Sequence, residues 1–433
     1  MAVIFKNAKI FTQDGFKTHD VILNDNKLFL DEQNFSSDID REIDLTNLYL
    51  LPGFVDVHVH FREPGFEYKE TILTGSKAAA HGGYTAVCTM PNLKPVPSNL
   101  ENLKRELEII NRDAVIKIFP IGAITKNQSG RGELSNIEEL APYVIAFSDD
   151  GKGVQNENLM LDAMKRIKAI NGMITAHCEV ESELKQGGCI HEGEYAKKFN
   201  HVGINSASEF LEVERDIKLA EQTGCKFHVC HVSTKESVNL IRKAKNRGVN
   251  ITAETAPHYL IFNDMDLQED GKFKMNPPIR SEDDKQALIQ GIQDGTIDCI
   301  ITDHAPHSLE EKSRGLEKSA FGIVGLETCF AVMYTNLVLK NIISLEKLLE
   351  LMCVNPRKIF NLKNSGSGYI ENNCVADFVI MDLDKIFTID PKNFYSKGKS
   401  TPFENMKVQG QVLATYVNGN KIYDAKEGII CAN

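Results

Sequence analysis

Residues 50–62 read Leu50-Leu51-Pro52-Gly53-Phe54-Val55-Asp56-Val57-His58-Val59-His60-Phe61-Arg62, an apolar stretch that ends in two histidines and an arginine. The apolar and β-branched residues from Phe54 onward predict a buried strand. Because successive side chains of a strand alternate between its two faces, His58, His60 and Arg62 are expected to share one face. Two imidazoles at that spacing can bind one divalent metal, and the arginine can bind a carboxylate through paired hydrogen bonds. A pair of core histidines near a surface arginine is the equally simple alternative.

The composition narrows the class of protein. The 433 residues include 49 Lys and Arg against 60 Asp and Glu, a formal net charge of -11 that disfavours nucleic-acid binding. Residues 1–7 lack a basic segment followed by an apolar run, and no apolar stretch is long enough to span a bilayer, so neither a signal peptide nor a membrane partner is expected. Ten cysteines without zinc-finger spacing indicate free thiols in a reducing compartment. We expect a cytoplasmic enzyme.

After residue 50 the chain repeats the order strand, polar loop, helix. The predicted strands cover residues 54–60, 85–90, 116–121, 144–148, 173–177, 226–231, 250–253 and 299–302. Charged amphipathic helices are predicted at 99–111, 157–171, 206–223, 235–247 and 282–293. Eight strands in this order predict an α/β fold, a parallel (β/α)8 TIM-type barrel over residues 50–361. A doubly wound sheet is the alternative, but no Gly-x-Gly-x-x-Gly turn follows an early strand.

The two ends of the chain differ from its centre. Residues 1–49 and 362–433 alternate short apolar runs with turn residues, the pattern of small antiparallel β modules. With the barrel between them, the economical arrangement is one small β-sandwich domain built from both termini.

Residues that bind metals follow five of the predicted strands. They are His58, His60, Asp149, Asp150, His177, His231 and Asp303. Catalytic groups of such barrels lie at the carboxyl ends of the strands, so these side chains are expected to converge. Imidazole with carboxylate suits Zn²⁺ best, with Mn²⁺, Co²⁺ and Fe²⁺ as alternatives. Metals lower the pKa of bound water, and Asp303 is placed to move its proton, which predicts hydrolysis, or its reverse, at an amide-like carbonyl.

Six motifs carry a more specific signal. They are residues 58–65 (His-Val-His-Phe-Arg-Glu-Pro-Gly), 89–92 (Thr-Met-Pro-Asn), 231–234 (His-Val-Ser-Thr), 254–258 (Glu-Thr-Ala-Pro-His), 276–280 (Asn-Pro-Pro-Ile-Arg) and 302–307 (Thr-Asp-His-Ala-Pro-His). In this order along the whole chain they resemble the dihydroorotases, cyclic amidohydrolases, in their long (type I) bacterial form. His-x-His after a strand is shared by many amidohydrolases, whereas the contexts of Arg62, Asn92 and Asn276 are more particular to dihydroorotases.

The resemblance implies a reaction and a set of roles. The reaction is the reversible cyclisation of N-carbamoyl-L-aspartate to L-dihydroorotate in de novo pyrimidine (UMP) biosynthesis, with a metal-bound hydroxide nucleophile and Asp303 as acid/base. One or two Zn²⁺ per chain are implied, two being favoured. His58, His60 and Asp303 would hold the first ion, His177 and His231 the second, and Asp150 would bridge them. The implied substrate-binding residues are His60, Arg62, Asn92, Asn276, His307, Phe321 and Gly322.

The sequence leaves two features of the site undecided. Hydantoinases and allantoinases bridge their metals with a carboxylated lysine from strand four, whereas this chain has Ser148-Asp149-Asp150 there and its next lysine is Lys152. Asp150 is the predicted bridge and Asp149 the alternative, and the shorter carboxylate leaves the metal count open. Residues 308–320, after strand eight, are either a lid over the substrate or a solvated loop.

Two other functions compete with dihydroorotase. One is a hydantoinase-, dihydropyrimidinase- or allantoinase-like amidohydrolase, which Arg62 and Asn92 argue against because those substrates lack the carboxylate that the pair would bind. The other is a non-catalytic scaffold for aspartate transcarbamoylase, which would be expected to have lost metal ligands that this chain keeps. The expected partners are a small-molecule substrate, further copies of the chain in a homo-oligomer, and possible association with aspartate transcarbamoylase.

Overall fold

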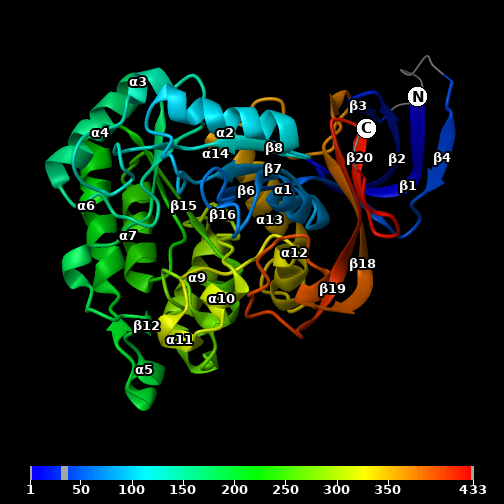
Figure 1. The fold of residues 1–433 in the computed structure, drawn as a ribbon. Coiled ribbons are helices and arrows are strands. Elements are labelled where there is room, and N and C mark those ends of the chain that lie inside the picture. Colours follow the sequence, from blue (N-terminus) through cyan, green and yellow to red (C-terminus); the bar gives the residue numbers. More distant parts are fainter. Residues whose placement is uncertain (1, 31–37, 431–433) are drawn as a thin grey trace.

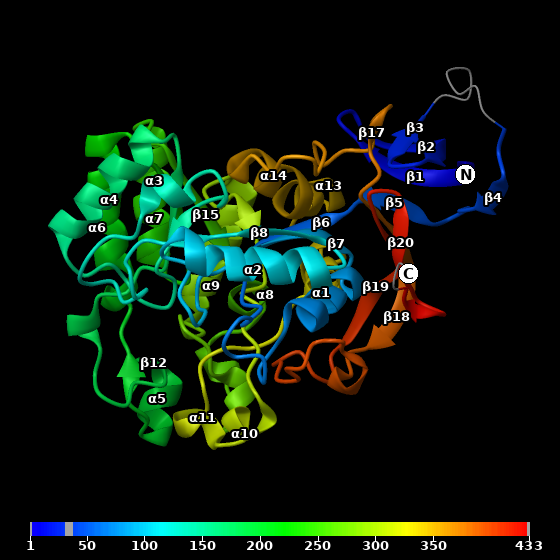
Figure 2. The ribbon, with the colours of Figure 1, turned by 45° about the horizontal axis from the view of Figure 1, so that its top comes forward.

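The computed structural model describes residues 2–30 and 38–430. It consists of a barrel surrounded by helices, with a large, mostly antiparallel sheet on one side that is built from both terminal segments (Figures 1 and 2). Helices α4, α6 and α7 lie on the side of the barrel that faces away from this sheet. Residues 1, 31–37 and 431–433, which belong to the predicted composite domain, lie outside the described residues.

The barrel strands are all parallel. They are β6 (Phe54–Val59), β7 (Tyr84–Thr89), β8 (Lys117–Pro120), β9 (Gly122–Ala123), β10 (Phe147–Ser148), β11 (Met173–Ala176), β14 (Lys226–Val229), β15 (Ile251–Thr255) and β16 (Cys299–Ile300). Only Ile121 separates β8, which pairs with β7, from β9, which pairs with β10, so the two form the third barrel strand. The ring closes where Val59 pairs with His304. The predicted (β/α)8 barrel is confirmed.

Strands four and eight are shorter than predicted. Strands β10 and β16 have two residues each. Outside these residues, single backbone hydrogen bonds continue the pairing with the neighbouring strands, for example Ile145 N–H to Pro120 O at 3.0 Å and Ile301 N–H to Thr255 O at 3.0 Å.

The long helices begin and end within two residues of the predicted ranges. They are α2 (Leu100–Asp113), α4 (Glu157–Ala169), α6 (Ala207–Thr223), α7 (Lys235–Asn246) and α9 (Glu282–Asp294), in addition to α1 (Ile72–His81). Polar side chains accept a backbone N–H of the first turn in five of these six helices, the caps being Thr71, Asn99, Asn156, Thr234 and Ser281. Such caps satisfy N–H groups that have no partner within the helix.

Shorter elements fill the connections. The helices are α3 (Ile137–Leu140), α5 (Glu194–Phe199), α8 (Pro257–Ile261), α10 (Leu309–Lys312), α11 (Gly315–Lys318), α12 (Cys329–Met333), α13 (Leu345–Leu349) and α14 (Asn355–Phe360). Strands β12 (Ile190–His191) and β13 (Gly203–Ile204) pair with each other. Within residues 2–30 and 38–430, no helix combines the length and the apolar character needed to cross a bilayer.

Both chain ends contribute to one ten-stranded sheet. Its strands are β1 (Ala2–Thr12), β2 (Gly15–Asn24), β3 (Lys27–Phe29), β4 (Arg41–Asp44), β5 (Tyr49–Pro52), β17 (Cys374–Val375), β18 (Phe378–Thr388), β19 (Lys407–Val417), β20 (Asn420–Asp424) and β21 (Gly428–Ile429). The two ends meet where β5 pairs with β18 and β3 with β17. The predicted β module from both termini is thus confirmed as one continuous sheet with its own apolar core, while the domain limits stay predictions.

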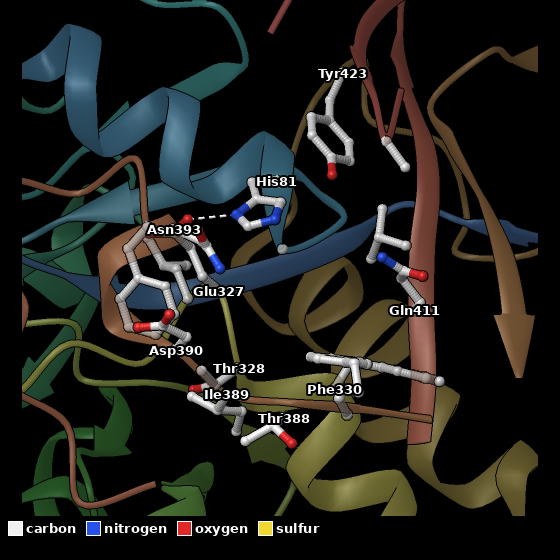
Figure 3. Close-up of a pocket in the computed structure, with 18 residues that line it drawn as sticks. His81, Glu327, Thr328, Phe330, Thr388, Ile389, Asp390, Asn393, Gln411 and Tyr423 are labelled. Carbon is white, nitrogen blue, oxygen red and sulfur yellow. Dashed lines mark hydrogen bonds and ion pairs between the residues drawn. The ribbon is translucent and has the colours of Figure 1, made fainter. Parts of the chain in front are cut away.

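A cavity of about 380 Å³ lies where the terminal sheet meets the barrel (Figure 3). In the figure, His81 at the end of α1 points toward Glu327, to which its Nδ1 is hydrogen-bonded. The ring of Tyr423 from β20 lies beside His81, with ring centroids 5.0 Å apart. Glu327 also accepts the backbone N–H groups of Tyr395 at 2.8 Å and Ser396 at 3.1 Å. These contacts join the segment after β18 to the barrel.

The cysteines are free thiols wherever the structure describes them. Eight are buried and Cys374 is partly buried. Cys431 lies outside the described residues.

Arg357 of α14 connects the end of the barrel to its first strand. Its side chain is buried and donates hydrogen bonds to the carbonyl oxygens of Gly53 at 2.8 Å, Cys353 at 2.9 Å and Ser365 at 2.7 Å. One buried guanidinium therefore joins three segments of the chain through hydrogen bonds.

We expect Arg357→Met to lower the free energy of unfolding by about 3 kcal/mol, because three buried carbonyls would lose a charged donor. Denaturant unfolding followed by circular dichroism measures this change. Arg166→Met is the matched control, since Arg166 pairs with Glu138 at the surface and its loss should cost less than about 1 kcal/mol. Equal losses in the two variants would contradict the role assigned to Arg357.

Candidate metal centre

The six predicted metal ligands meet inside the barrel at the carboxyl ends of its strands. They are His58, His60, Asp150, His177, His231 and Asp303, none more than 6% exposed. His58 lies in β6, and the others lie at or just beyond the ends of β6, β10, β11, β14 and β16. Residues far apart in the sequence are thus brought to one point, as the strand order predicted.

The cluster has two parts that share His58. In the first, Asp303 Oδ1 lies 3.1 Å from His60 Nε2 and 3.6 Å from His58 Nε2. In the second, Asp150 Oδ1 lies 3.3 Å from His58 Nε2 and 3.4 Å from His231 Nε2. Within each part, the three candidate ligand atoms all lie within 4.8 Å of one another. Asp150 also has its second oxygen 3.5 Å from His60 Nε2, so its carboxylate lies between the two parts.

His177 lies at the edge of the second part. Its Nδ1 is 3.0 Å from His231 Nε2 and 3.8 Å from Asp150 Oδ1. Its Nε2 faces Glu179, whose carboxylate oxygen is 3.7 Å away.

The structure separates the two adjacent aspartates after β10. Asp149 accepts the backbone N–H groups of Ile124 and Thr125, each at 2.9 Å, and of Gly130 at 3.0 Å. Its carboxylate is therefore hydrogen-bonded to the loop after β9, whereas the carboxylate of Asp150 faces the imidazoles. The geometry thus favours Asp150 over Asp149 as the carboxylate that could bridge two metal ions.

The buried carboxylates of the cluster remain ionised. Burial acts to raise the pKa of Asp150, but His58 and His231 beside it hold that pKa well below the usual value. Burial has the same effect on Asp303, and its hydrogen bond with His60 together with the neighbouring imidazoles holds its pKa below the usual value. Two negative charges deep inside a barrel suit a cation as their partner.

Several nitrogen atoms of the cluster are unsatisfied. His58 Nε2, His60 Nδ1, His177 Nε2 and His231 Nδ1 are buried and have no hydrogen-bond partner among the residues described. Of these atoms only His58 Nε2 faces the cluster, because His60, His177 and His231 turn their other ring nitrogens toward Asp150. Imidazole nitrogens together with ionised carboxylates form the donor set of Zn²⁺, and the residues present fit this metal.

Glu254 is a functional residue that the sequence analysis did not single out. It is fully buried in β15 and accepts hydrogen bonds from His58 Nδ1 at 2.6 Å and His228 Nε2 at 3.0 Å. A carboxylate can only accept, so His58 carries a proton on Nδ1, and its Nε2 faces the cluster. Carboxylates of this kind orient metal-binding histidines in many sites. An acidic residue at the end of the seventh strand, within the 254–258 motif, was the available signal.

Cys230 lies closer to the cluster than its place in the sequence suggests. Its Sγ lies within 4.8 Å of ligand atoms of His58 and Glu254. Burial raises the pKa of the Cys230 thiol to about 12, so it remains protonated. Its Sγ also contacts Thr175 Oγ1 at 3.0 Å, which agrees with a packing role.

Three residues of the site have a left-handed backbone. The φ angles are 61° at Arg62, 30° at His231 and 47° at Asp303. This region costs side-chain-bearing residues about 1 kcal/mol or more, and residues held there tend to gather at functional sites. At each strand end, the unusual φ turns the chain out of the strand direction.

Three of the predicted substrate residues carry buried polar atoms without a partner among the described residues. Arg62 Nε, Asn92 Oδ1 and Asn276 Oδ1 are buried atoms without a hydrogen-bond partner in the described part of the chain. The amide of Asn92 donates to Asp150 O at 2.8 Å, which ties this residue to the loop that carries the central carboxylate. His307 differs, because both of its ring nitrogens contact other residues of the protein.

The segment 308–320 forms α10 and α11. Lys312 is buried and donates hydrogen bonds to Lys274 O at 3.0 Å and Ala320 O at 2.7 Å, while Leu316 packs in an apolar cluster. The segment is thus anchored to the protein, which disfavours a merely solvated loop. A lid function stays a prediction.

Comparisons with known proteins agree with this geometry. A family model described as dihydro-orotase-like matches residues 48–237. A dihydroorotase of Fusobacterium nucleatum subsp. nucleatum is 49% identical over 428 residues, which cover 99% of this chain and 100% of that protein. A dihydroorotase of Listeria innocua is 45% identical and covers 98% of this chain and 99% of its own length. The chain belongs to the dihydroorotase family. The family predicted from the motifs is therefore confirmed.

Solved structures extend the likeness to other cyclic amidohydrolases. An L-hydantoinase (dihydropyrimidinase) from Arthrobacter aurescens superimposes with a TM-score of 0.88 at 26% identity, over 99% of this chain and 97% of that chain. A dihydropyrimidinase from Brevibacillus agri has a TM-score of 0.85 at 22% identity, over 99% of this chain and 96% of that chain, a likeness of fold. This member of the dihydroorotase family thus shares its fold with a hydantoinase and a dihydropyrimidinase.

We expect Glu254→Gln to weaken zinc binding by about 10–100-fold, because an amide holds the His58 imidazole less firmly than a carboxylate. Zinc retained against a competing chelator measures this change. Glu106→Gln is the matched control, since Glu106 is also a buried glutamate but hydrogen-bonds only to Thr89, at 3.0 Å, among the interactions described. Zinc retention that is unchanged in Glu254→Gln, or equally lowered in both variants, would contradict this role.

Proposed function

We propose that this protein is a zinc-dependent dihydroorotase, which interconverts N-carbamoyl-L-aspartate and L-dihydroorotate in pyrimidine biosynthesis. The observation that carries the proposal is the buried His and Asp cluster with an unpartnered arginine atom beside it, in a chain 49% identical to a dihydroorotase over its whole length. A metal cluster serves any cyclic amidohydrolase, whereas a buried cation nearby serves a substrate that carries a carboxylate.

The residues of the cluster would hold two Zn²⁺ ions. His58, His60 and Asp303 would bind one, His177 and His231 the other, and Asp150 would lie between them. When bound, such ions polarise a carbonyl group and lower the pKa of water.

Asp303 is the residue proposed to move the proton. Its ionised carboxylate accepts a proton from the attacking water in ring opening and delivers it to the ring nitrogen as the C–N bond breaks. In cyclisation, it accepts the proton of the attacking carbamoyl nitrogen and returns it to the departing oxygen. Cyclisation of the dianionic N-carbamoyl-L-aspartate to the monoanionic ring consumes one further proton from solution and releases water.

The substrate would be held by residues around the cluster. Arg62 would pair with the α-carboxylate, and the amides of Asn92 and Asn276 would bind its other polar groups, with the backbone of Phe321 and Gly322 closing the pocket. Gly322 has φ 132°, and a Cβ there would lie 2.6 Å from Ala305 O, so only glycine fits this turn. His60 and His307 complete the proposed binding set.

A homo-oligomeric state, association with aspartate transcarbamoylase and a cytoplasmic location also belong to this proposal. Size-exclusion chromatography with light scattering, with and without purified aspartate transcarbamoylase, tests the first two.

We expect the zinc-loaded protein to turn over both L-dihydroorotate and N-carbamoyl-L-aspartate. Asp303→Asn should lower kcat by about 10²–10⁴-fold in each direction, because the proton carrier is lost. Cyclisation consumes a proton, so the equilibrium ratio of L-dihydroorotate to N-carbamoyl-L-aspartate depends on pH. In the pH range above the pKa values of both substrates, this ratio should rise about tenfold for each unit by which the pH is lowered. Ultraviolet absorbance of the ring measures both. Turnover of hydantoin or dihydrouracil, with none of L-dihydroorotate, would favour the hydantoinase-like alternative.

The two adjacent aspartates give a second prediction, on metal content. We expect Asp150→Asn to retain at most about one zinc per chain and Asp149→Asn to retain the wild-type content, because only Asp150 faces the imidazoles. Elemental analysis of the purified proteins measures the content, and circular dichroism verifies that both are folded. Zinc lost from folded Asp149→Asn alone would assign the bridge to Asp149.

A further inference from the structure

Lys69, in the loop after β6, contacts a residue of the proposed substrate pocket. Its Nζ lies 3.1 Å from His307 Nδ1. The other ring nitrogen of His307, Nε2, lies 2.7 Å from the carbonyl oxygen of Phe321. The imidazole is therefore held at both ends, by an ammonium on one side and a carbonyl on the other.

These two partners allow one protonation state. A carbonyl oxygen only accepts hydrogen bonds and an ammonium only donates them. His307 Nε2 must therefore carry a proton, and Nδ1 must offer its lone pair to Lys69. A proton on Nδ1 would point at the ammonium and leave that contact repulsive. The imidazole is neutral, with its proton on Nε2.

The charges around His307 support the neutral form. Burial, Arg62, Lys69 and Lys312 lower the pKa of His307 to about 3. Glu311 of α10 acts in the opposite sense, with Oε2 3.5 Å from His307 Nδ1, but its other oxygen is paired with Lys69 Nζ at 3.0 Å. On its outer side, His307 borders a cavity of about 550 Å³ that is also lined by Asp270, Lys272, Asp390, Lys392, Lys397, Lys399 and Glu404.

We propose that Lys69 is a positioning residue, whose ammonium fixes His307 as the neutral tautomer with its proton on Nε2. That proton lies on the side of the Phe321 and Gly322 backbone, where the substrate pocket is proposed. The Phe321 carbonyl oxygen accepts that proton, so the neutral ring holds the backbone that is proposed to close the pocket. The link to substrate binding rests on the proposed function, but the tautomer does not.

Lys69 is itself held in place from two sides. Its ammonium lies 5.5 Å from the ring centroid of Tyr68 and 5.8 Å from that of Phe66, in addition to its ion pair with Glu311. A purely structural alternative follows from the ion pair, namely that Lys69 serves only to anchor α10 through Glu311. Glu311→Gln separates the two roles, because it removes the ion pair and keeps the ammonium.

The direct test is nuclear magnetic resonance of the zinc-loaded protein with ¹⁵N-labelled histidine, with His307→Gln used to assign the signals. We expect wild type, Lys69→Arg and Glu311→Gln to show the His307 proton on Nε2 from pH 6 to pH 9. Lys69→Met, which keeps the length of the side chain without its charge, should show a mixture of tautomers or a His307 that titrates in this range. Retention of the single Nε2–H tautomer in folded Lys69→Met would overturn the proposal.

The kinetic test uses the same variants with L-dihydroorotate. We expect Lys69→Met to raise KM by about tenfold or more, the value of the hydrogen bond that holds the Phe321 backbone beside the pocket, with kcat changed by less than about threefold. Lys69→Arg should restore KM, and Glu311→Gln should leave it near the wild-type value. An equal rise of KM in Glu311→Gln and Lys69→Met would assign Lys69 to the anchoring of α10. Wild-type protein without turnover would overturn the proposed function, while the resonance result would still decide the tautomer.

Discussion

The burial of two ionised carboxylates among imidazoles is the interaction on which the rest of the structure depends. Asp150 and Asp303 are almost inaccessible to solvent, and burying a charge without partners costs several kcal/mol. The barrel meets that cost by bringing four histidines from three strands within contact distance. The parallel order of the strands makes this possible, because all of their carboxyl ends meet at one end of the barrel.

The residues around the cluster fix the orientation of its members. Glu254 accepts a hydrogen bond from His58 Nδ1, so that His58 Nε2 is directed at the cluster. Asp149 is bound by three backbone N–H groups of the neighbouring loop, which fixes the chain just before Asp150. Carboxylates of three kinds thus lie within a short distance: those that face the proposed metals, one that orients a ligand and one that shapes a loop. Their chemistry is the same, and only their surroundings separate their roles.

The proposed substrate pocket is lined by side chains of the opposite, positive charge. Arg62, Lys69 and Lys312 bring positive charge to one side of the cluster, in a protein whose net charge is -11. The neutral state of His307 is a consequence of these cations, and its Nε2 proton follows from the carbonyl it faces. A dianionic substrate would therefore meet cations on this side and the proposed metals on the other.

Much of this protein follows from its sequence alone. The spacing of strands and helices determined the barrel, because apolar periodicity reports which faces are buried. The positions of His58, His60, His177, His231 and Asp303 at strand ends determined the cluster, because a parallel barrel brings such ends together. The roles of Asp149, Glu254 and Lys69 were decided only by the tertiary structure. Each depends on a partner distant in the chain: Asp149 on Ile124 and Thr125, Glu254 on His58 and His228, and Lys69 on His307. Sequence patterns report the face on which a side chain lies, whereas a hydrogen bond requires two groups to meet within about 3 Å, and only the folded chain sets that distance.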